Sequence, residues 1–335
     1  MKGRFGKIFV TILGLTAAVV ILDVFCWWYY NPLAYLHEDT RATDTVRQAN
    51  TFTSRATEGF GQAVTDANGY NNAAVPEDIF VLMMGSSQME GFNVMQNETA
   101  ASWLGALLPE NGVEGCVYNI GMSSHTLTRN IANLDRALER FKPEGYVVLE
   151  AHDVAISKWE IDKALSDKFG RRKATSVPLP DIISERPLLR TLYNQYMTLT
   201  GGGETAGDNR RLKASVIDAY NEAILELMQH VADVAEKHGV TAVFLYHPHL
   251  VLQEDGTAIT QTDPNCLNAF AMACEAAGVV FVDMTQDFMD AYAQSYTMPH
   301  GYSNTMPGAG HLNKTGHEMI ARALCREIVG LEADK

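Results

Sequence analysis

The stretch IFVLMMGSSQMEG, residues 79–91, decides how the rest of the chain is interpreted. Its first six residues form an apolar run of the length expected for a strand that is buried on both faces. Gly85 and two serines follow at once, which predicts a tight turn out of the strand. The stretch therefore predicts a buried strand that places Ser87 at a strand-to-helix turn, exposed and flanked by backbone amides.

Four further apolar runs alternate with helical patterns in the rest of the chain. The runs are Val117–Ile120, Tyr146–Leu149, Thr241–Tyr246 and Val279–Val282. The clearest amphipathic stretch spans about 212–238, and a last helix is expected from about Lys314, with Asn313 as its N-cap. Such alternation is typical of a parallel sheet with helices on both faces. We therefore predict an α/β fold with three layers, helix, sheet and helix.

Two segments do not follow this alternation. Residues 31–76 are rich in Thr, Asn, Ala and Gly with little hydrophobic periodicity, and we interpret them as a stalk or linker. Residues 157–211 contain three prolines and a run of three glycines, which predicts an insertion that could act as a lid. The main domain is then expected at 77–332.

The N-terminus has the features of a membrane anchor. Residues 8–28 are mostly apolar, and about 20 apolar residues are enough to span a bilayer. Basic residues precede the span, and Trp27, Trp28, Tyr29 and Tyr30 end it as an aromatic cluster. We predict a single-pass anchor in residues 1–30, with the N-terminus inside the cell and the domain outside. A cleaved signal peptide is the alternative.

The charge of the chain excludes one class of partner. The formal net charge is −14, and no cluster of Lys and Arg appears. Binding to a phosphate backbone needs such a cluster, so we predict no nucleic-acid partner. An acidic surface also suits an anionic bilayer poorly, so attachment to the membrane must be hydrophobic.

Polar residues follow each apolar run at the point where its strand should end. Ligands of open parallel sheets bind outside the carboxyl ends of the strands, so these residues are candidates for a site. They are Ser86 and Ser87 after the first run, Gly121 to Ser124 after the second, Glu150 to Asp153 after the third, His247 and His249 after the fourth, and Asp283 after the fifth. His311 lies in a glycine-rich stretch before the last helix.

This set of motifs resembles the SGNH/GDSL hydrolase family. Residues 85–91 resemble the first block of that family, Gly-Asp-Ser with a later Gly, although Ser86 replaces the Asp. Gly121 matches the second block, and Asp153 is the retained residue of the third, Gly-x-Asn-Asp. His311-Leu312-Asn313 resembles the fifth block. The resemblance covers roughly residues 68–329.

The resemblance implies a flavodoxin-like sandwich and a serine nucleophile. Ser87 would attack, and His311 would be its base. The amides of Ser87 and Gly121 and a side chain of the third block would bind the oxyanion, and His152 stands where the family has its Asn, beside Asp153. No cofactor is implied.

The acid that should orient His311 is the main departure from the family pattern. The family has an Asp three residues before the His, and here that residue is Gly308. We consider Asp283, Glu150 and Asp153 as replacements, and also a dyad without an acid. His247 and His249 flank Pro248 without a third ligand at a recognisable spacing, so no metal site is predicted.

Three functions fit these observations. The first is an esterase that acts outside the membrane on O-acylated envelope glycan or a related ester. The second is an O-acyltransferase that takes an acyl group from a carrier or membrane partner and passes it to a polysaccharide hydroxyl. The third is a non-catalytic envelope protein that keeps the fold to bind glycan, for which the loss of the Asp at Gly308 and the Asn at His152 is the best support.

Overall fold

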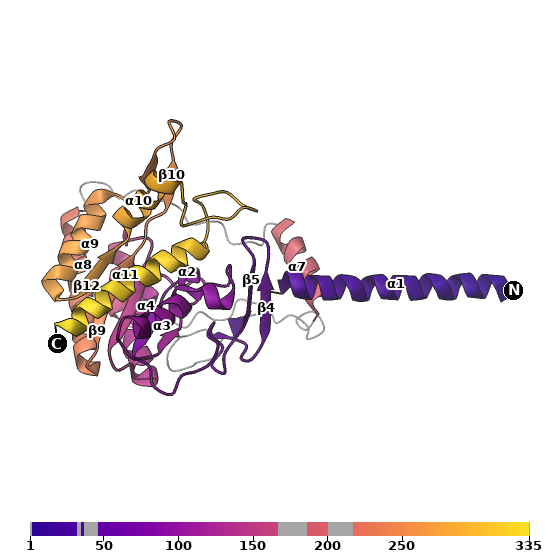
Figure 1. The fold of residues 1–335 in the computed structure, drawn as a ribbon, viewed down its shortest axis with the longest axis horizontal. Coiled ribbons are helices and arrows are strands. Elements are labelled where there is room, and N and C mark those ends of the chain that lie inside the picture. The colour runs from indigo at the N-terminus through magenta and orange to yellow at the C-terminus, as the bar shows by residue number, and fades with distance from the viewer. Residues whose placement is uncertain (1, 32–34, 37–45, 167–185, 200–216, 335) are drawn as a thin grey trace.

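The centre of the molecule is a five-stranded parallel sheet. The computed structural model describes residues 2–31, 35–36, 46–166, 186–199 and 217–334 (Figure 1). The strands lie in the order β12-β9-β8-β6-β7. They are β6 (Val81–Met84), β7 (Val117–Asn119), β8 (Tyr146–Ala151), β9 (Thr241–Tyr246) and β12 (Val280–Asp283). Counted from β7, this is the 2-1-3-4-5 order of flavodoxin-like folds. The predicted strands and fold class are confirmed.

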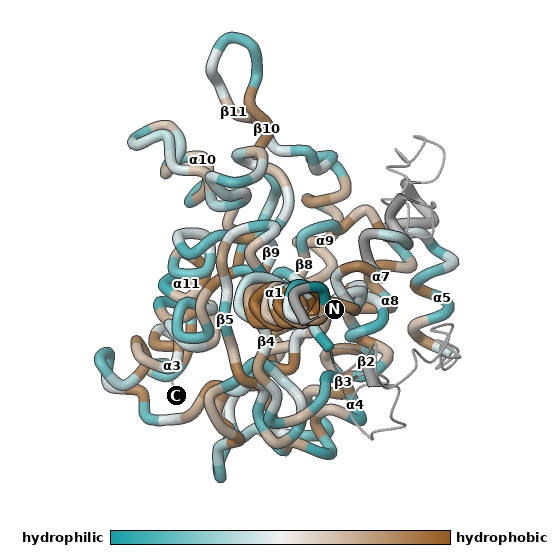
Figure 2. The backbone as a smooth tube through the Cα atoms, turned by 90° about the vertical axis from the view of Figure 1, so that its right-hand side faces the viewer, coloured by the Kyte–Doolittle hydropathy of each residue, from teal (hydrophilic) through white to brown (hydrophobic). Residues whose placement is uncertain are grey.

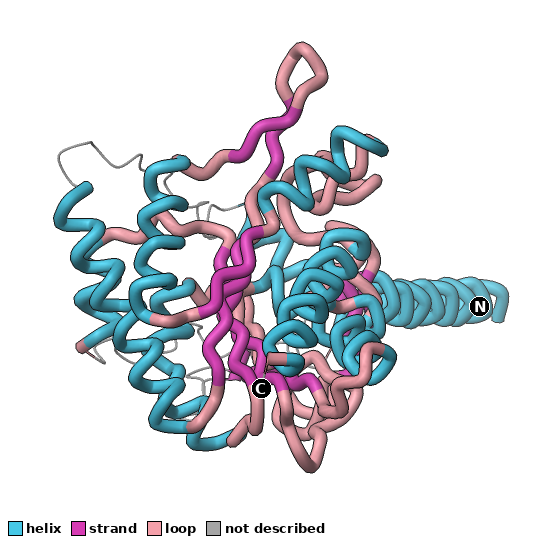
Figure 3. The backbone as a smooth tube through the Cα atoms, turned by 60° about the vertical axis from the view of Figure 1, so that its left-hand side comes forward, coloured by secondary structure: helices cyan, strands magenta, loops and turns pink. Residues whose placement is uncertain are grey.

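Helices cover both faces of the sheet (Figure 3). One apolar cluster joins alternate sheet residues such as Val81 and Met83 to α3 (Ala100–Glu110), α10 (Thr285–Ser295) and α11 (Lys314–Ala333). A second cluster joins their neighbours, such as Leu82 and Met84, to α4 (Leu127–Phe141), α8 (Ile217–His238) and α9 (Pro264–Ala277). Because successive strand residues point to opposite faces, a continuous apolar run supplies both clusters.

Shorter elements surround these layers. They are α2 (Ser87–Glu90), the 3-10 helix η1 (Gln96–Glu98), α5 (Lys158–Leu165), α7 (Pro187–Leu199) and the hairpin of β10 (Leu250–Leu252) with β11 (Ala258–Thr260). The parts of the predicted insertion at 167–185 and 200–211 lie outside the described residues. The described parts contain α5, which packs against α8, and α7, which packs against the N-terminal helix.

The N-terminal helix α1 (Lys2–Tyr29) leads directly into the folded domain (Figure 1). Among the described helices it alone, over Arg4–Tyr29, is long and apolar enough to cross a membrane. Figure 2 shows that its residues are mostly hydrophobic, and its large apolar side chains are exposed. A membrane span and a signal sequence both fit this finding. Asp23, inside this helix, accepts a hydrogen bond from the Leu188 amide of α7 at 3.0 Å.

The segment predicted as a stalk is folded where the structure describes it. It contains β1 (Tyr30–Asn31), β2 (Tyr35–Leu36), β3 (Val46–Arg47), β4 (Phe52–Arg55) and β5 (Gly61–Val64). β4 pairs with both β1 and β5. The hairpin β4–β5 is therefore attached to β1, the strand that directly follows α1. The rings of Trp27 and Phe52 stack at 4.4 Å, and those of Trp28 and Phe60 lie 5.5 Å apart. Thus residues 46–76 are ordered and packed, unlike the expected linker, whereas the division of the chain into independent domains stays a prediction.

A buried ion pair fastens this segment to the main domain. The Nε of Arg47 lies 2.8 Å from Glu90 Oε1, and both side chains are only 2% exposed. Burial alone would raise the pKa of Glu90, but the charge of Arg47 outweighs it and lowers that pKa. The pair therefore holds the end of α2, next to Ser87, against the N-terminal segment.

Replacing Arg47 with methionine should lower the free energy of unfolding by about 3–5 kcal/mol, because it removes the ion-pair partner of the buried Glu90 carboxylate. Chemical denaturation of the detergent-solubilised chain measures this loss. The matched control is Lys237→Met, which breaks the largely exposed pair with Asp135 and should cost less than about 1 kcal/mol. Equal effects of the two substitutions would contradict the anchoring role of Arg47.

Candidate active site

Ser87 begins the short helix α2 immediately after β6. The Ser86 hydroxyl caps this helix by accepting a hydrogen bond from the Gln88 amide at 3.2 Å. Gly91 ends the helix with φ of 69°, a conformation that favours glycine. As the first residue of the helix, Ser87 has an amide without an intrahelical acceptor and a partly exposed side chain. The turn predicted after the first apolar run is therefore present.

His311 lies against Ser87, although 224 residues separate them. Its Nε2 is 2.9 Å from Ser87 Oγ. Gln88 fixes the loop that carries His311, since its Oε1 accepts from the Leu312 amide at 2.7 Å and its Nε2 donates to the Gly310 carbonyl at 3.2 Å. Gln88, next to Ser87, thus helps to position His311, a role that the sequence motif alone did not reveal.

The carboxylate that binds His311 belongs to Glu58, on the turn between β4 and β5. Glu58 Oε2 lies 2.7 Å from His311 Nδ1, and Oε1 accepts from the His311 amide at 2.6 Å. Asn93 and Asn304 hold the turn by donating to the carbonyls of Glu58 and Gly59 at 2.9 and 3.2 Å. Serine, histidine and glutamate are therefore joined in one line of contacts.

Two glycines explain why the acid comes from this turn. Gly308, at the family's Asp position, has φ of +80°, and a Cβ there would approach the Leu250 carbonyl oxygen to 2.8 Å. Gly310 has φ of +84°, and a Cβ there would collide with Glu58 Oε1. Both positions need glycine. Residue 308 therefore carries no acid, and the absence of a side chain at Gly310 leaves room for the Glu58 carboxylate.

The charge of Glu58 suits this role. Partial burial acts to raise its pKa, but the hydrogen bond from His311 and the charge of that side chain outweigh burial and bring the pKa below its ordinary value of 4.5. Glu58 is therefore ionised at neutral pH. With Nδ1–H donated to Glu58, the lone pair on Nε2 faces the Ser87 hydroxyl, which is the tautomer that a general base requires.

The acids considered from the sequence occupy other positions. Asp283 is exposed and accepts from the Thr285 amide at 2.8 Å at the start of α10. Asp153 is exposed and accepts from the Ala155 amide at 2.9 Å. Glu150 does not contact His311 either. The carboxylate bound to His311 is that of Glu58. Their positions at strand ends suggested that they could orient His311. Instead, each of the two aspartates binds a backbone amide two residues later in its own turn.

Glu150 lies buried beneath the nucleophile turn. Its Oε2 accepts from the Ser86 amide at 2.7 Å, and its Oε1 contacts His152 Nδ1 at 2.8 Å and His247 Nε2 at 3.0 Å. Burial acts to raise its pKa, but the charge of His152 and the hydrogen bonds of both histidines hold that pKa well below 4.5. The same contact raises the pKa of His152 against the effect of burial.

The predicted oxyanion donors differ in their availability. The Gly121 amide donates to the Asn119 side chain at 2.8 Å, so this donor is already engaged. His152 is held by Glu150 through Nδ1, and its side chain is 37% exposed. Together with the Ser87 amide, His152 stays a candidate donor, whereas Gly121 would first have to release Asn119.

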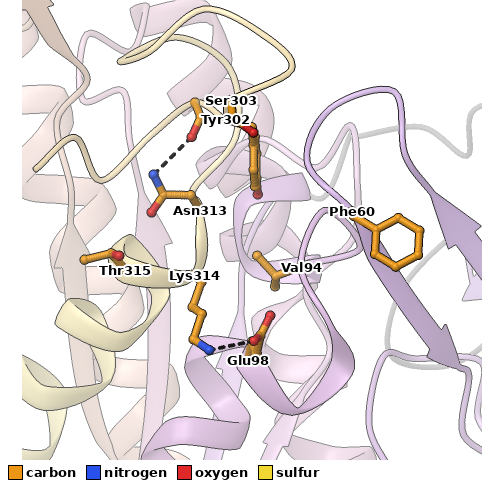
Figure 4. A pocket seen from close by; sticks show the side chains of 9 residues that line it. Phe60, Val94, Glu98, Tyr302, Ser303, Asn313, Lys314 and Thr315 are labelled. Atoms are coloured by element: carbon orange, nitrogen blue, oxygen red, sulfur yellow. Dashed lines mark hydrogen bonds and ion pairs between the residues drawn. The ribbon is translucent and has the colours of Figure 1, made fainter.

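A pocket of about 350 Å³ opens beside the loop that carries His311 (Figure 4). It is lined by Phe60, Val94, Glu98, Gly301, Tyr302, Ser303, Asn313, Lys314 and Thr315. Phe60 is two residues from Glu58, and Asn313 is two residues from His311. Lys314 crosses the pocket wall to pair with Glu98 at 2.7 Å. The pocket adjoins the triad without including Ser87.

Some solved structures are similar to this chain at low sequence identity. A GDSL-like lipase from Parabacteroides merdae is 15% identical, with a TM-score of 0.41, over 78% of this chain and 99% of that one. A lipase/acylhydrolase from Enterococcus faecalis is 12% identical, with a TM-score of 0.42, over 75% and 95%. The psychrotrophic esterase EstA from Pseudoalteromonas sp. is 12% identical, with a TM-score of 0.39, over 76% and 98%.

No protein-family model matches the chain, and no curated protein matches its sequence. The solved structures similar to it include SGNH hydrolases and GDSL-like lipases, but at TM-scores near 0.4. Likeness at that level does not assign a reaction. The sheet order defines the fold, and the contacts among Ser87, His311 and Glu58 carry the chemistry.

Proposed function

We propose that the chain is a serine-dependent ester hydrolase of the SGNH/GDSL type, with Ser87 as nucleophile, His311 as base and Glu58 as the acid that orients it. The single observation that carries the proposal is the continuous contact from Ser87 Oγ through both ring nitrogens of His311 to Glu58. A serine hydroxyl becomes nucleophilic when a neighbouring imidazole takes its proton, and this arrangement supplies that imidazole.

The reaction would run in two halves. His311 Nε2 takes the Ser87 proton as Oγ forms a bond to the ester carbonyl carbon, and the carbonyl oxygen becomes an oxyanion. When the tetrahedral intermediate collapses, the bond to the alcohol breaks, and His311 returns the proton to the leaving alkoxide. Water, deprotonated by His311, then attacks the carbonyl carbon of the acyl-serine; the bond to Ser87 Oγ breaks, His311 returns the proton to Oγ, and the acid leaves. The Glu58 carboxylate stabilises the imidazolium in both halves.

The position of Glu58 favours an ester close to a membrane surface. Its hairpin pairs with β1, which continues α1, and the Phe60 ring two residues away contacts Trp28 at the end of that helix. If α1 spans the bilayer with its N-terminus inside, the site lies outside the cell beside the headgroups. O-acylated envelope glycan, or a related ester at that surface, is then the proposed substrate.

The second candidate is an O-acyltransferase, and the same proximity to α1 favours it. A membrane partner could deliver the acyl group to Ser87, and a glycan hydroxyl would replace water in the second half. The non-catalytic alternative loses one of its two supports, because Glu58 takes the place of the acid missing at Gly308.

Hydrolysis of an aryl acetate by the full chain in detergent tests the proposal. Release of acetate that depends on Ser87 supports the hydrolase, and a folded protein without turnover or an acyl-enzyme overturns it. An added oligosaccharide separates the two enzymes, since a transferase forms acylated glycan at the expense of free acetate.

A further inference from the structure

Four histidines pack together beside Glu150, apart from the triad. His152 and His247 contact this carboxylate directly. The His247 and His300 rings lie 5.4 Å apart between centroids, and the His249 and His300 rings lie 4.1 Å apart. The proposed ester hydrolysis needs only His311 as its base, so His247, His249 and His300 have no role in that reaction.

Three of these residues present metal-ligand atoms to one another. Glu150, His152 and His247 each offer one ligand atom, and these three atoms all lie within 4.8 Å of one another. The two nitrogens are 2.8 and 3.0 Å from Glu150 Oε1. Ligand atoms around a tetrahedral zinc ion, with bonds of about 2.0–2.1 Å, lie roughly 3.3 Å apart. Small movements would therefore admit an ion among these atoms.

The fold holds this set in place. Glu150 and His152 lie at the carboxyl end of β8, and His247 lies at that of β9, so neighbouring parallel strands present all three. The second oxygen of Glu150 is fixed by the Ser86 amide at 2.7 Å. His247 is fully buried, whereas His152 is partly exposed and gives an ion a path of entry.

The same histidine cluster contains buried ring nitrogens without a partner, in addition to the atoms that would bind the ion. Within the part of the chain that the structure describes, His247 Nδ1 and both ring nitrogens of His300 are buried and have no hydrogen-bond partner. Such groups are costly unless they bind something.

We propose that Glu150, His152 and His247 bind one divalent transition-metal ion, with zinc as the ion that two imidazoles and a carboxylate suit best. Ligation through Nδ1 of His152 leaves the hydrogen of that ring on Nε2. The ion would thus hold His152 as an N–H donor beside the Ser87 turn. The binding site itself does not depend on the proposed ester hydrolysis.

Calorimetric titration of the chelator-treated full chain with ZnCl₂ tests this site. Wild type should bind one Zn²⁺ with micromolar or tighter affinity, and its melting temperature should rise with added Zn²⁺. Glu150→Gln and His152→Gln should each weaken binding at least about 100-fold and remove the thermal shift. His238→Gln, at a surface histidine that contacts Asp135, is the matched control and should leave both unchanged.

Absence of binding below about 100 μM in folded wild type would overturn the site, and so would equal Zn²⁺ affinity in wild type and the His152→Gln variant. His152 is partly exposed, so this variant keeps the test decisive if Glu150→Gln fails to fold. Because the readout is metal binding, an inactive Ser87 would leave the result unchanged.

Discussion

Replacing Ser87 with alanine is expected to reduce aryl-ester hydrolysis by about 10⁴–10⁶-fold, because the acyl-enzyme can no longer form. The fold should be unaffected, since the hydroxyl is partly exposed and its contact is with His311. His311→Ala should cause a loss of similar size, and the double variant should be no worse than either single one, because the two residues act as a unit. Initial rates with matched protein concentrations measure these losses.

The neighbouring Ser86 supplies the matched control. Ser86→Ala removes a helix cap and about 1 kcal/mol of stability, but it leaves the nucleophile in place. Its rate should stay within a few-fold of wild type. A Ser87→Ala variant that kept near wild-type activity would mean that another group attacks the ester.

Replacing Glu58 with glutamine is expected to reduce kcat by about 10²–10⁴-fold with little change in KM. The amide keeps the shape of the side chain, but it removes the charge that stabilises the His311 imidazolium and can hold the wrong tautomer. Steady-state kinetics of the variant measure the effect. The loss should appear in kcat because the interaction matters in the transition state.

The Asp283→Asn variant distinguishes Glu58 from Asp283 as the acid that orients His311. Asp283 only accepts a hydrogen bond from the Thr285 amide, so its replacement should change kcat by no more than about two- to three-fold. If Asp283→Asn caused the larger loss and Glu58→Gln the smaller one, Glu58 would not be the orienting acid.

The sequence was sufficient for the central sheet and for the proposed pairing of Ser87 with His311. The five apolar runs are strands, because a parallel strand buried on both faces leaves a continuous apolar signature. Ser87 and His311 meet because one follows the first strand and the other precedes the last helix, both at one edge of the sheet.

Glu58 was not predicted, for a physical reason. It lies in a segment without hydrophobic periodicity, and its contact with His311 spans 253 residues. The sequence of a short polar hairpin turn has no pattern that predicts which distant residues the turn will contact. The glycine at 308 signalled only that the usual acid was missing, and its positive φ becomes clear only in the folded loop.

The histidine cluster was missed for a related reason. His247 and His249 were judged by their local spacing, but the ligand atoms of Glu150, His152 and His247 come from the ends of two adjacent strands. Likewise, Gly121 matched a motif, and only the structure reveals that Asn119 already accepts its amide hydrogen.

Reaction of the full chain with a fluorophosphonate probe tests the central claim most directly, because the probe bonds only to an activated serine. Intact and peptide mass would locate the adduct in wild type, Ser87→Ala, His311→Ala and Glu58→Gln. The account predicts one adduct on Ser87 in wild type, none in the Ser87 and His311 variants, and much slower labelling in Glu58→Gln. Folded wild type that stays unlabelled, or that carries the adduct on another residue, would contradict it.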